Sequence, residues 1–208
     1  TNTVNNGAIV VNGGSCNVGG ILGMTSSNND NSTANITYCA NKGDITIYNL
    51  GSERAAGIIG YIKNGKINFC YNTGNVLAYS DNGTTISRVS YGTHYGIFGY
   101  ANINAKNPLE VKYCYNASST PLEAEICLIR NPAHGTFQNF YMEGRTEYEI
   151  ELGGTAGNPG TPFTSPEDLL EKITATSDGA QAYTANPEQG GYPVLNHEVP
   201  AYLPNNNY

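Results

Sequence analysis

The chain has 208 residues, of which 39% are hydrophobic and 13% charged, and its formal net charge at pH 7 is −7. The length suits a single domain with a sizeable core, and the strongly patterned apolar content argues against disorder of the charged kind. The acidic balance without a basic stripe argues against nucleic acid as a partner. No apolar run approaches the roughly 20 residues of a membrane span, so we expect no membrane insertion.

A glycine-rich block recurs three times, at residues 19–24, 56–61 and 95–100. Its copies share a pair of glycines: Gly20 and Gly23, Gly57 and Gly60, Gly96 and Gly99. Each copy is short, apolar and bounded by small polar residues, which is typical of a strand. A glycine at a strand corner can adopt a positive φ and lets a neighbouring backbone approach closely.

A second block follows each glycine block, at residues 36–41, 67–72 and 111–116. It carries a cysteine at the same position in each copy: Cys39, Cys70 and Cys114. Strict alternation would place Ile67 and Cys70 on opposite faces, whereas a bend near Asn68 would turn both inward. We favour the bend, because Phe140 stands at the cysteine position of a later copy and a large apolar group suits an interior.

A third strand is predicted after the second block, at residues 44–48, 74–77 and 148–152. A repeated unit cannot bury its apolar face alone, so the copies must stack, and crossovers between parallel strands prefer the right hand. The sequence therefore predicts an all-β fold, a right-handed parallel β-helix (β-solenoid) of about four three-sided coils. A degraded fourth copy is expected at residues 126–129 and 137–141. Many of the 28 asparagines are expected at corners, where asparagine tolerates left-handed geometry.

The repeat domain is expected to span residues 1–152, followed by a Gly/Pro-rich linker loop at 153–161 and a cap and tail at 162–208. The cap is expected to contain one short helix, with Ser165 as N-cap and Pro166 at the first helical position. Because the open end of a stack needs covering, we expect this segment to close it.

The pairing of Gly-Ile-Ile-Gly-Tyr with Ile-Asn-Phe-Cys-Tyr-Asn-Thr-Gly-Asn-Val, at residues 57–61 and 67–76, resembles the GLUG motif. That repeat is found in secreted and surface-attached bacterial proteins, some of them adhesins and IgA-protease-like proteins. Residues 56–76 match best, 19–46 match well and 95–116 match in part. The resemblance implies a structural or adhesive β-solenoid that is extracellular or at the bacterial cell surface. It supplies no catalytic residues to transfer.

Ligand binding is expected from loops and from exposed tyrosine rings. The irregular stretch 77–94 contains Asp81 and Arg88, residues 51–54 contain Arg54, and variable loops on a rigid scaffold usually carry binding function. Tyrosines recur at two repeat positions: Tyr61 and Tyr100, and Tyr71, Tyr115 and Tyr141. Stacked rings of this kind either bind sugar or peptide or only stabilise neighbouring strands.

The sequence does not point to a metal or a cofactor. The three repeat cysteines are expected to form a ladder of buried thiols, although disulfides between neighbouring layers are sterically allowed. No Cys-x-x-Cys motif and no histidine pair indicates a metal site, and the contexts of His94, His134 and His197 do not suggest catalysis. Three alternating glutamates could hold calcium or cleave polysaccharide, but the period of two favours a solvent-facing strand. They are Glu147, Glu149 and Glu151.

The first hypothesis is a non-catalytic adhesive or spacer module that contacts a glycan or protein on host or microbial surfaces. The chain opens without an initiator Met or a signal peptide, which suits a processed piece of a longer exported protein. The alternatives are a polysaccharide-degrading enzyme and a purely structural stalk or assembly domain. An exposed edge layer at the N-terminus would favour the last.

Overall fold

The structure is a computed structural model that describes residues 1–25, 33–50, 54–79, 93–103, 106, 108–118, 128–130, 135–143, 160–188 and 191–199. Strands dominate the described residues, and all strand pairs are parallel except β17 (Tyr183–Thr184) with β18 (Val194–Leu195). The predicted all-β class with parallel sheets is therefore confirmed. The right-handed β-helix stays a prediction.

Four parallel sheets, here called A to D, make up the repeat region. Sheet A contains β1 (Thr3–Asn5), β5 (Ala34–Asn41), β9 (Gly65–Asn72), β13 (Leu109–Asn116), β15 (Gly135–Glu143) and β16 (Gly160–Phe163), in that order. Sheet B contains β2 (Ile9–Gly14), β6 (Ile45–Leu50) and β10 (Val76–Tyr79). Sheet C contains β3 (Asn17–Gly19), β7 (Arg54–Ala56) and β11 (Thr93–Tyr95). Sheet D contains β4 (Leu22–Met24), β8 (Ile59–Ile62), β12 (Phe98–Asn102) and β14 (Leu128–Arg130).

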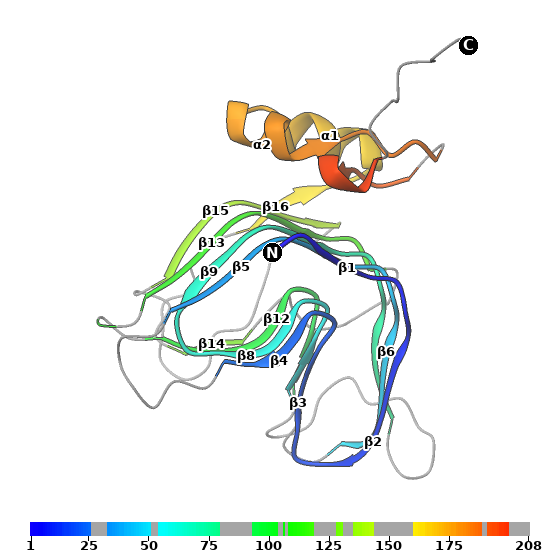
Figure 1. Cartoon of the computed structure of the whole chain (residues 1–208), viewed down its shortest axis with the longest axis vertical. Coiled ribbons are helices and arrows are strands. Elements are labelled where there is room, and N and C mark those ends of the chain that lie inside the picture. The colour runs from blue at the N-terminus through cyan, green and yellow to red at the C-terminus, as the bar shows by residue number, and fades with distance from the viewer. Residues whose placement is uncertain are drawn as a thin grey trace, which may run out of the picture.

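The chain visits sheets A, B, C and D in turn, so that each passage adds one layer (Figure 1). The first layer is β1–β4, the second β5–β8 and the third β9–β12. Equivalent residues meet in register: Cys39 lies opposite Cys70, the Ile21 amide donates to Ile58 O at 3.1 Å, and the Ile58 amide donates to Ile97 O at 3.1 Å. The predicted stacking of like on like is confirmed.

Each layer has four strands rather than the predicted three. The glycine-rich block is two short strands, one in sheet C and one in sheet D, with a corner between them at Gly20 or Gly57. No turn signal other than the glycines marks this corner in the sequence, so the block reads as one strand. The degraded copy is confirmed where it is described, since Phe137 lies opposite Val111 and Leu128 opposite Tyr100. Residues 126 and 127 and the predicted strand 148–152 lie outside the described residues.

The corner glycines do not use a positive φ, contrary to expectation. Among the described residues, the glycines with positive φ are Gly13 and Gly65. A Cβ on Gly57 would instead lie 2.1 Å from Cγ of Asn72 and 2.4 Å from the carbonyl oxygen of Gly96. The corner therefore requires glycine for close packing rather than for backbone freedom.

A left-handed residue precedes the cysteine in each layer and produces the predicted bend. Its φ is 54° at Tyr38, 54° at Phe69 and 52° at Tyr113, and the first layer has Asn2 there with φ 56°. The bend lies one residue after Asn68. It turns Ile67 and Cys70 both into the core, where each is fully buried. The rings of Tyr38, Phe69 and Tyr113 stack outside at centroid distances of 4.8 and 5.0 Å.

Phe69 combines a strained, left-handed backbone with a ring that stacks on two neighbours. The stabilities of its truncation variants should therefore follow an unusual order. Phe69→Ala loses both ring contacts and keeps the left-handed backbone, whereas Phe69→Gly loses the same contacts and removes the strain. We expect the glycine variant to be the more stable by about 1 kcal/mol, the reverse of the usual order in strands. Urea unfolding of the two variants measures the difference. An alanine variant as stable as the glycine variant would contradict the account.

The C-terminal segment packs on the outer face of sheet A. It begins with β16, which is itself the last strand of sheet A, and the elements that lie on the face are α1 (Pro166–Ile173), α2 (Ser177–Ala182), β17, β18 and the 3-10 helix η2 (Asn196–Glu198). Its apolar residues, such as Phe163, Leu169 and Leu195, form one buried cluster with Tyr71 and Tyr115 of sheet A. Figure 1 shows both helices over sheet A, so most of the segment covers a side of the stack, and only β16 adds to the end that we expected the segment to close.

Two further details of this segment differ from the prediction. It has two α-helices instead of one, and residues 160–163 form β16, so the expected boundary between linker and cap falls inside a strand. The helix start is confirmed, because Ser165 Oγ accepts a hydrogen bond from the Asp168 amide at 3.1 Å.

Candidate functional site

Three of the predicted binding tyrosines are buried beneath the C-terminal segment. Tyr71, Tyr115 and Tyr141 are 1%, 0% and 5% exposed. They are in register on β9, β13 and β15, and the rings of Tyr71 and Tyr115 stack 4.8 Å apart. The expectation that these rings are exposed is wrong, because the segment covers the face from which they project.

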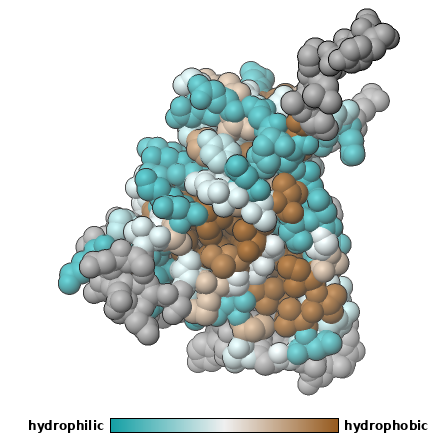
Figure 2. Space-filling view, viewed as in Figure 1, coloured by the Kyte–Doolittle hydropathy of each residue, from teal (hydrophilic) through white to brown (hydrophobic). Residues whose placement is uncertain are grey.

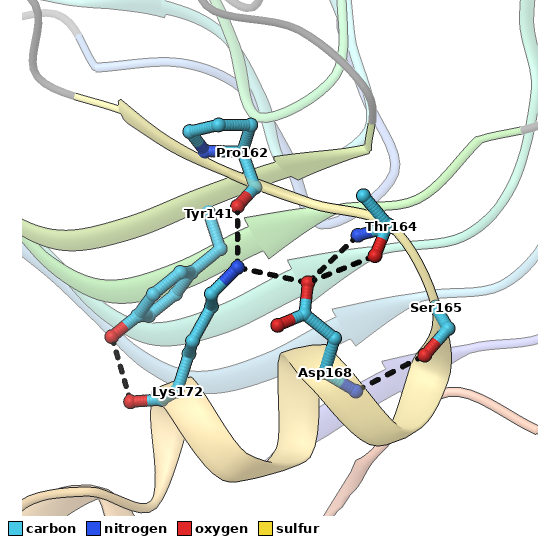
Figure 3. Close-up of polar contacts among 6 residues, drawn as sticks. All are labelled: Tyr141, Pro162, Thr164, Ser165, Asp168 and Lys172. Atoms are coloured by element: carbon cyan, nitrogen blue, oxygen red, sulfur yellow. Dashed lines mark hydrogen bonds and ion pairs between the residues drawn. The ribbon is translucent and has the colours of Figure 1, made fainter.

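The hydroxyls of these tyrosines attach the segment to sheet A. Tyr71 donates to Glu198 Oε1 at 2.8 Å, Tyr115 donates to Pro193 O, and Tyr141 donates to Lys172 O at 2.9 Å. Figure 3 shows the last contact beside Asp168, which accepts from Lys172 Nζ at 2.8 Å. The tyrosine row is therefore an internal docking surface.

The Glu198 carboxylate makes further contacts besides its hydrogen bond with Tyr71. Its side chain is 7% exposed and forms an ion pair with Lys42, while its Oε1 accepts from the Leu195 amide at 3.0 Å. Burial, reinforced by the nearby Glu198 carboxylate, raises the pKa of Tyr71 well above its ordinary value. Tyr71 therefore stays protonated and remains a donor to this carboxylate.

Removing the Tyr71 hydroxyl should loosen the end of the segment. In Tyr71→Phe, Glu198 loses a charge-assisted hydrogen bond in a buried site, and we expect the free energy of unfolding to fall by about 2 kcal/mol. Hydrogen exchange should rise in residues 191–199. Tyr48→Phe, at a tyrosine that is 38% exposed, is the matched control and should change neither quantity. Unchanged exchange in Tyr71→Phe would contradict this role.

Buried tyrosines also predict a loss of stability at high pH. Burial raises the pKa of Tyr71, Tyr115 and Tyr183 in the folded chain, so their contribution is complete below about pH 10, the ordinary tyrosine value, and declines above it. Unfolding midpoints measured from pH 8 to 11 should therefore fall in the upper half of that range, and less steeply in Tyr71→Phe. A flat profile would contradict the prediction.

Arg54, Tyr61 and Tyr100 do come together, as sequence reasoning could not foresee. The guanidinium carbon of Arg54 lies 5.0 Å from the Tyr61 ring centroid and 4.4 Å from that of Tyr100, and the two rings stack 5.6 Å apart. The rings are only 8% and 7% exposed, so they offer little surface to a ligand. This cluster joins sheets C and D through cation–π contacts. Asp81 and Arg88 lie outside the described residues.

Exposed aromatic rings occur at other positions. Tyr48 on β6 is 38% exposed and stacks on Tyr79 of β10 at 5.4 Å. Tyr38 is 36% exposed and lies at the end of the stack with Phe69 and Tyr113. The sequence held a signal for Tyr48 and Tyr79, because alternation after the inward residues Ile47 and Ala78 turns both outward. These rings could pack against a sugar ring or a peptide.

A ladder of asparagine side chains runs through the layers, and sequence reasoning missed it. The side-chain amide of Asn5 donates to Asn41 Oδ1 at 2.7 Å, that of Asn41 to Asn72 Oδ1 at 2.7 Å, and that of Asn72 to Asn116 Oδ1 at 2.8 Å. Asn41 and Asn72 are fully buried. The signal was an Asn-x-Gly spacing at residues 5–7, 41–43 and 72–74. Hydrogen bonding between layers, not left-handed geometry, is the reason for these asparagines.

The cysteine ladder is buried as predicted. Cys39, Cys70 and Cys114 are free thiols with 1%, 0% and 0% exposure, and Cys114 Sγ donates to Ile67 O at 3.2 Å. The hydrogen bond with Cys70, together with burial, raises the pKa of Cys39, and burial raises that of Cys70. Protonated, buried thiols are poor nucleophiles and poor metal ligands, so the ladder fills the core.

Among the described residues, Glu110 and Asp168 are the carboxylates with shifted pKa values, and both shifts favour the ionised form. Hydrogen bonds from Lys112 and then Asn68 lower the pKa of Glu110, and hydrogen bonds from Lys172 and the Thr164 amide lower that of Asp168. Neither suits the proton-donor role of polysaccharide hydrolysis. Within the described ranges, no group of three or more His, Cys, Asp or Glu side chains could hold a metal ion. Glu147, Glu149 and Glu151 lie outside those ranges, as does His134.

The first layer leaves an open face. β1, β2, β3 and β4 are each the edge strand of their sheet. Val10, Leu22 and Met24 of this layer are 63%, 38% and 44% exposed. In the view of Figure 2, apolar residues gather in the middle of the molecule and at the lower right. No helix in the described part of the chain is both long enough and apolar enough to span a membrane.

Comparisons with known proteins give the fold and little else. No family model and no curated protein matches the chain. Among solved structures, it is similar to the crystal structure of "a putative immunoglobulin A1 protease from Bacteroides ovatus", with a TM-score of 0.55 and 19% identity. The match covers 91% of this chain and 57% of the Bacteroides protein, so this chain spans little more than half of the length of that protein. At this identity the likeness shows a shared fold.

Proposed function

We propose that the chain is part of a right-handed parallel β-helix with GLUG-type repeats, from a bacterial protein that is exported to the surface or the medium. It acts there as a non-catalytic spacer and adhesion module. The observation that carries the proposal is the continuity of three side-chain ladders, of asparagines, thiols and stacked rings, across successive layers. Such ladders make a stiff rod, which is what a spacer requires.

The adhesive part of the proposal rests on the exposed stacks. Tyr48, which stacks on Tyr79, and Tyr38, which stacks on the partly buried Phe69, are the exposed rings of these stacks. Their ligand would be a glycan or a protein segment bound with modest affinity per site. Several copies in a longer parent chain would supply strength by multivalency.

The test is binding of the purified chain to glycan arrays and to host-matrix proteins. A Tyr48→Ala, Tyr79→Ala double variant should lose binding, and Val10→Ala, at an exposed aliphatic residue of the same sheet, should keep it. If the folded chain binds none of these ligands, the adhesive role is contradicted and the spacer role alone is retained. Release of reducing sugars from a polysaccharide would overturn the non-catalytic assignment.

A second candidate is an assembly domain, and the open face of the first layer favours it. Unpaired edges on four sheets recruit further strands unless something covers them.

A further inference from the structure

We propose that the open face of the first layer is a docking surface for one more β-layer of the same repeat chemistry, carried by another polypeptide segment. The proposal rests on the proposed spacer function and names the kind of partner that the face would accept. Four features of the face define that partner.

The first feature is the unpaired backbone. No strand of the described residues pairs with the outer edge of β1, β2, β3 or β4, so each of sheets A to D ends there. The second layer shows how such edges are used, since β5, β6, β7 and β8 each pair in parallel with the first-layer strand of their sheet. A partner that supplies four short strands in the same order would repeat those contacts.

The second feature is incomplete burial of the inward side chains. Ile9, Val11 and Ile21 are only partly buried, and they contact the core from its margin. Their counterparts one layer further in, Ile45, Ile47 and Ile58, are all 0% exposed. A docked layer with apolar residues at these positions would remove the remaining surface from water.

The third feature is the direction of the asparagine ladder. In every step the side-chain amide of the earlier layer donates to the side-chain oxygen of the next. Asn5 Oδ1 is therefore the oxygen that an earlier rung would use, and within the chain it accepts from the Gly7 amide at 3.1 Å. The partner should carry an asparagine above Asn5.

The fourth feature is Gly7, which no contact among the described residues requires. A Cβ on its equivalents Gly43 and Gly74 would lie 2.1 and 2.2 Å from the carbonyl oxygen of the preceding layer's glycine. A Cβ on Gly7 would meet nothing closer than Asn5 Oδ1, at 3.7 Å. Gly7 leaves room for the carbonyl group of a further layer, which the described residues do not supply.

These features disfavour a second copy of the chain as the partner. Stacked head to tail, another copy would offer the far end of its ladder, where Asn116 is followed in register by Met142 and then by Pro162 of the last strand, β16. Neither methionine nor proline has a side-chain amide with which to donate to Asn5. The partner is therefore a distinct layer that ends in an asparagine rung.

The experiment adds such a layer to the full chain. A copy of residues 34–67 is fused directly ahead of Thr1, which keeps the register because Thr3 lies opposite Cys39 and Cys39 opposite Cys70. Hydrogen exchange is then compared between the fused and the original chain. We expect the added strands to be protected and the exposed amides of β2 and β4 to exchange at least about tenfold more slowly.

Gly7→Ala is the decisive variant. In the original chain it should leave the unfolding midpoint unchanged, and in the fused chain it should abolish protection of the added layer. Replacing the asparagine of the added rung, Asn41→Leu in the copy only, should do the same. An added layer that stays unprotected while Gly7 is present overturns the proposal, as does protection that survives Gly7→Ala.

Sedimentation of the original chain tests the remaining alternative, which is docking of a second copy of the chain. We expect a monomer. Concentration-dependent association that Gly7→Ala removes would overturn the choice of partner in favour of a second copy. None of these readouts depends on ligand binding, so the failure of the adhesive role and the failure of this proposal are distinguishable.

Discussion

Asn72→Ala is expected to lower the free energy of unfolding by about 4 kcal/mol, because one fully buried side chain makes three hydrogen bonds. It accepts from Asn41 at 2.7 Å and donates to Asn116 Oδ1 and Gly74 O, both at 2.8 Å. Without the Asn72 side chain, Asn116 Oδ1 and Gly74 O lose this donor. Chemical denaturation, with hydrogen exchange of the second and third layers, measures the effect.

The matched control is Asn5→Ala in the same ladder. The side chain of Asn5 is only partly buried and makes a single hydrogen bond to another layer, to Asn41, so we expect a loss of about 1 kcal/mol. If Asn72→Ala and Asn5→Ala lowered the free energy of unfolding equally, the ladder would not act as a buried hydrogen-bond network. Asn72→Asp should be at least as harmful as alanine, since a carboxylate cannot donate to Asn116 and would be buried.

Gly57→Ala is expected to be the other severely destabilising substitution, at about 3 kcal/mol or more. The new methyl group would overlap the Asn72 side chain and the carbonyl oxygen of Gly96, and the latter belongs to backbone that is itself paired. Relief would require the second and third layers to separate locally. Thermal and chemical unfolding of the variant measure this cost.

Gly7→Ala is the control for Gly57→Ala, because its methyl group would enter ordinary contact with Asn5. We expect a change within about 0.5 kcal/mol. A tolerated Gly57→Ala, with the layers still in register, would show that the corner can relax. The close-packing explanation of the glycine-rich block would then be wrong.

The repeat layers could be predicted because their signals are local and recur. Ile21, Ile58 and Ile97 occupy one position in three similar blocks, and copies of a block that cannot bury itself must stack. Residues 1–25 were not recognised as a layer, since Thr3 replaces the cysteine and Asn2 the aromatic residue. Ahead of the glycine-rich block at residues 19–24, only the spacing from Asn5 to Gly7 and Ile9 survives there.

The fate of the tyrosines could not be predicted, because it depends on a segment far along the chain. Tyr71 and Tyr48 both project outward from their sheets, yet one is buried under residues 160–199 and the other is 38% exposed. Alternation shows which way a side chain points and not what later covers it. The pairing of Arg54 with Tyr61 and Tyr100 likewise requires the corner between sheets C and D, which the sequence did not reveal.

The way the C-terminal segment is attached determines how the stack should respond to tension. Its contacts with Tyr71, Tyr115 and Tyr141 fall on three neighbouring strands of sheet A, each belonging to a different layer. A pull on the segment would therefore load three strands together in shear, where a terminal strand alone would peel away one bond at a time. A surface protein under flow would gain mechanical endurance from such a clamp.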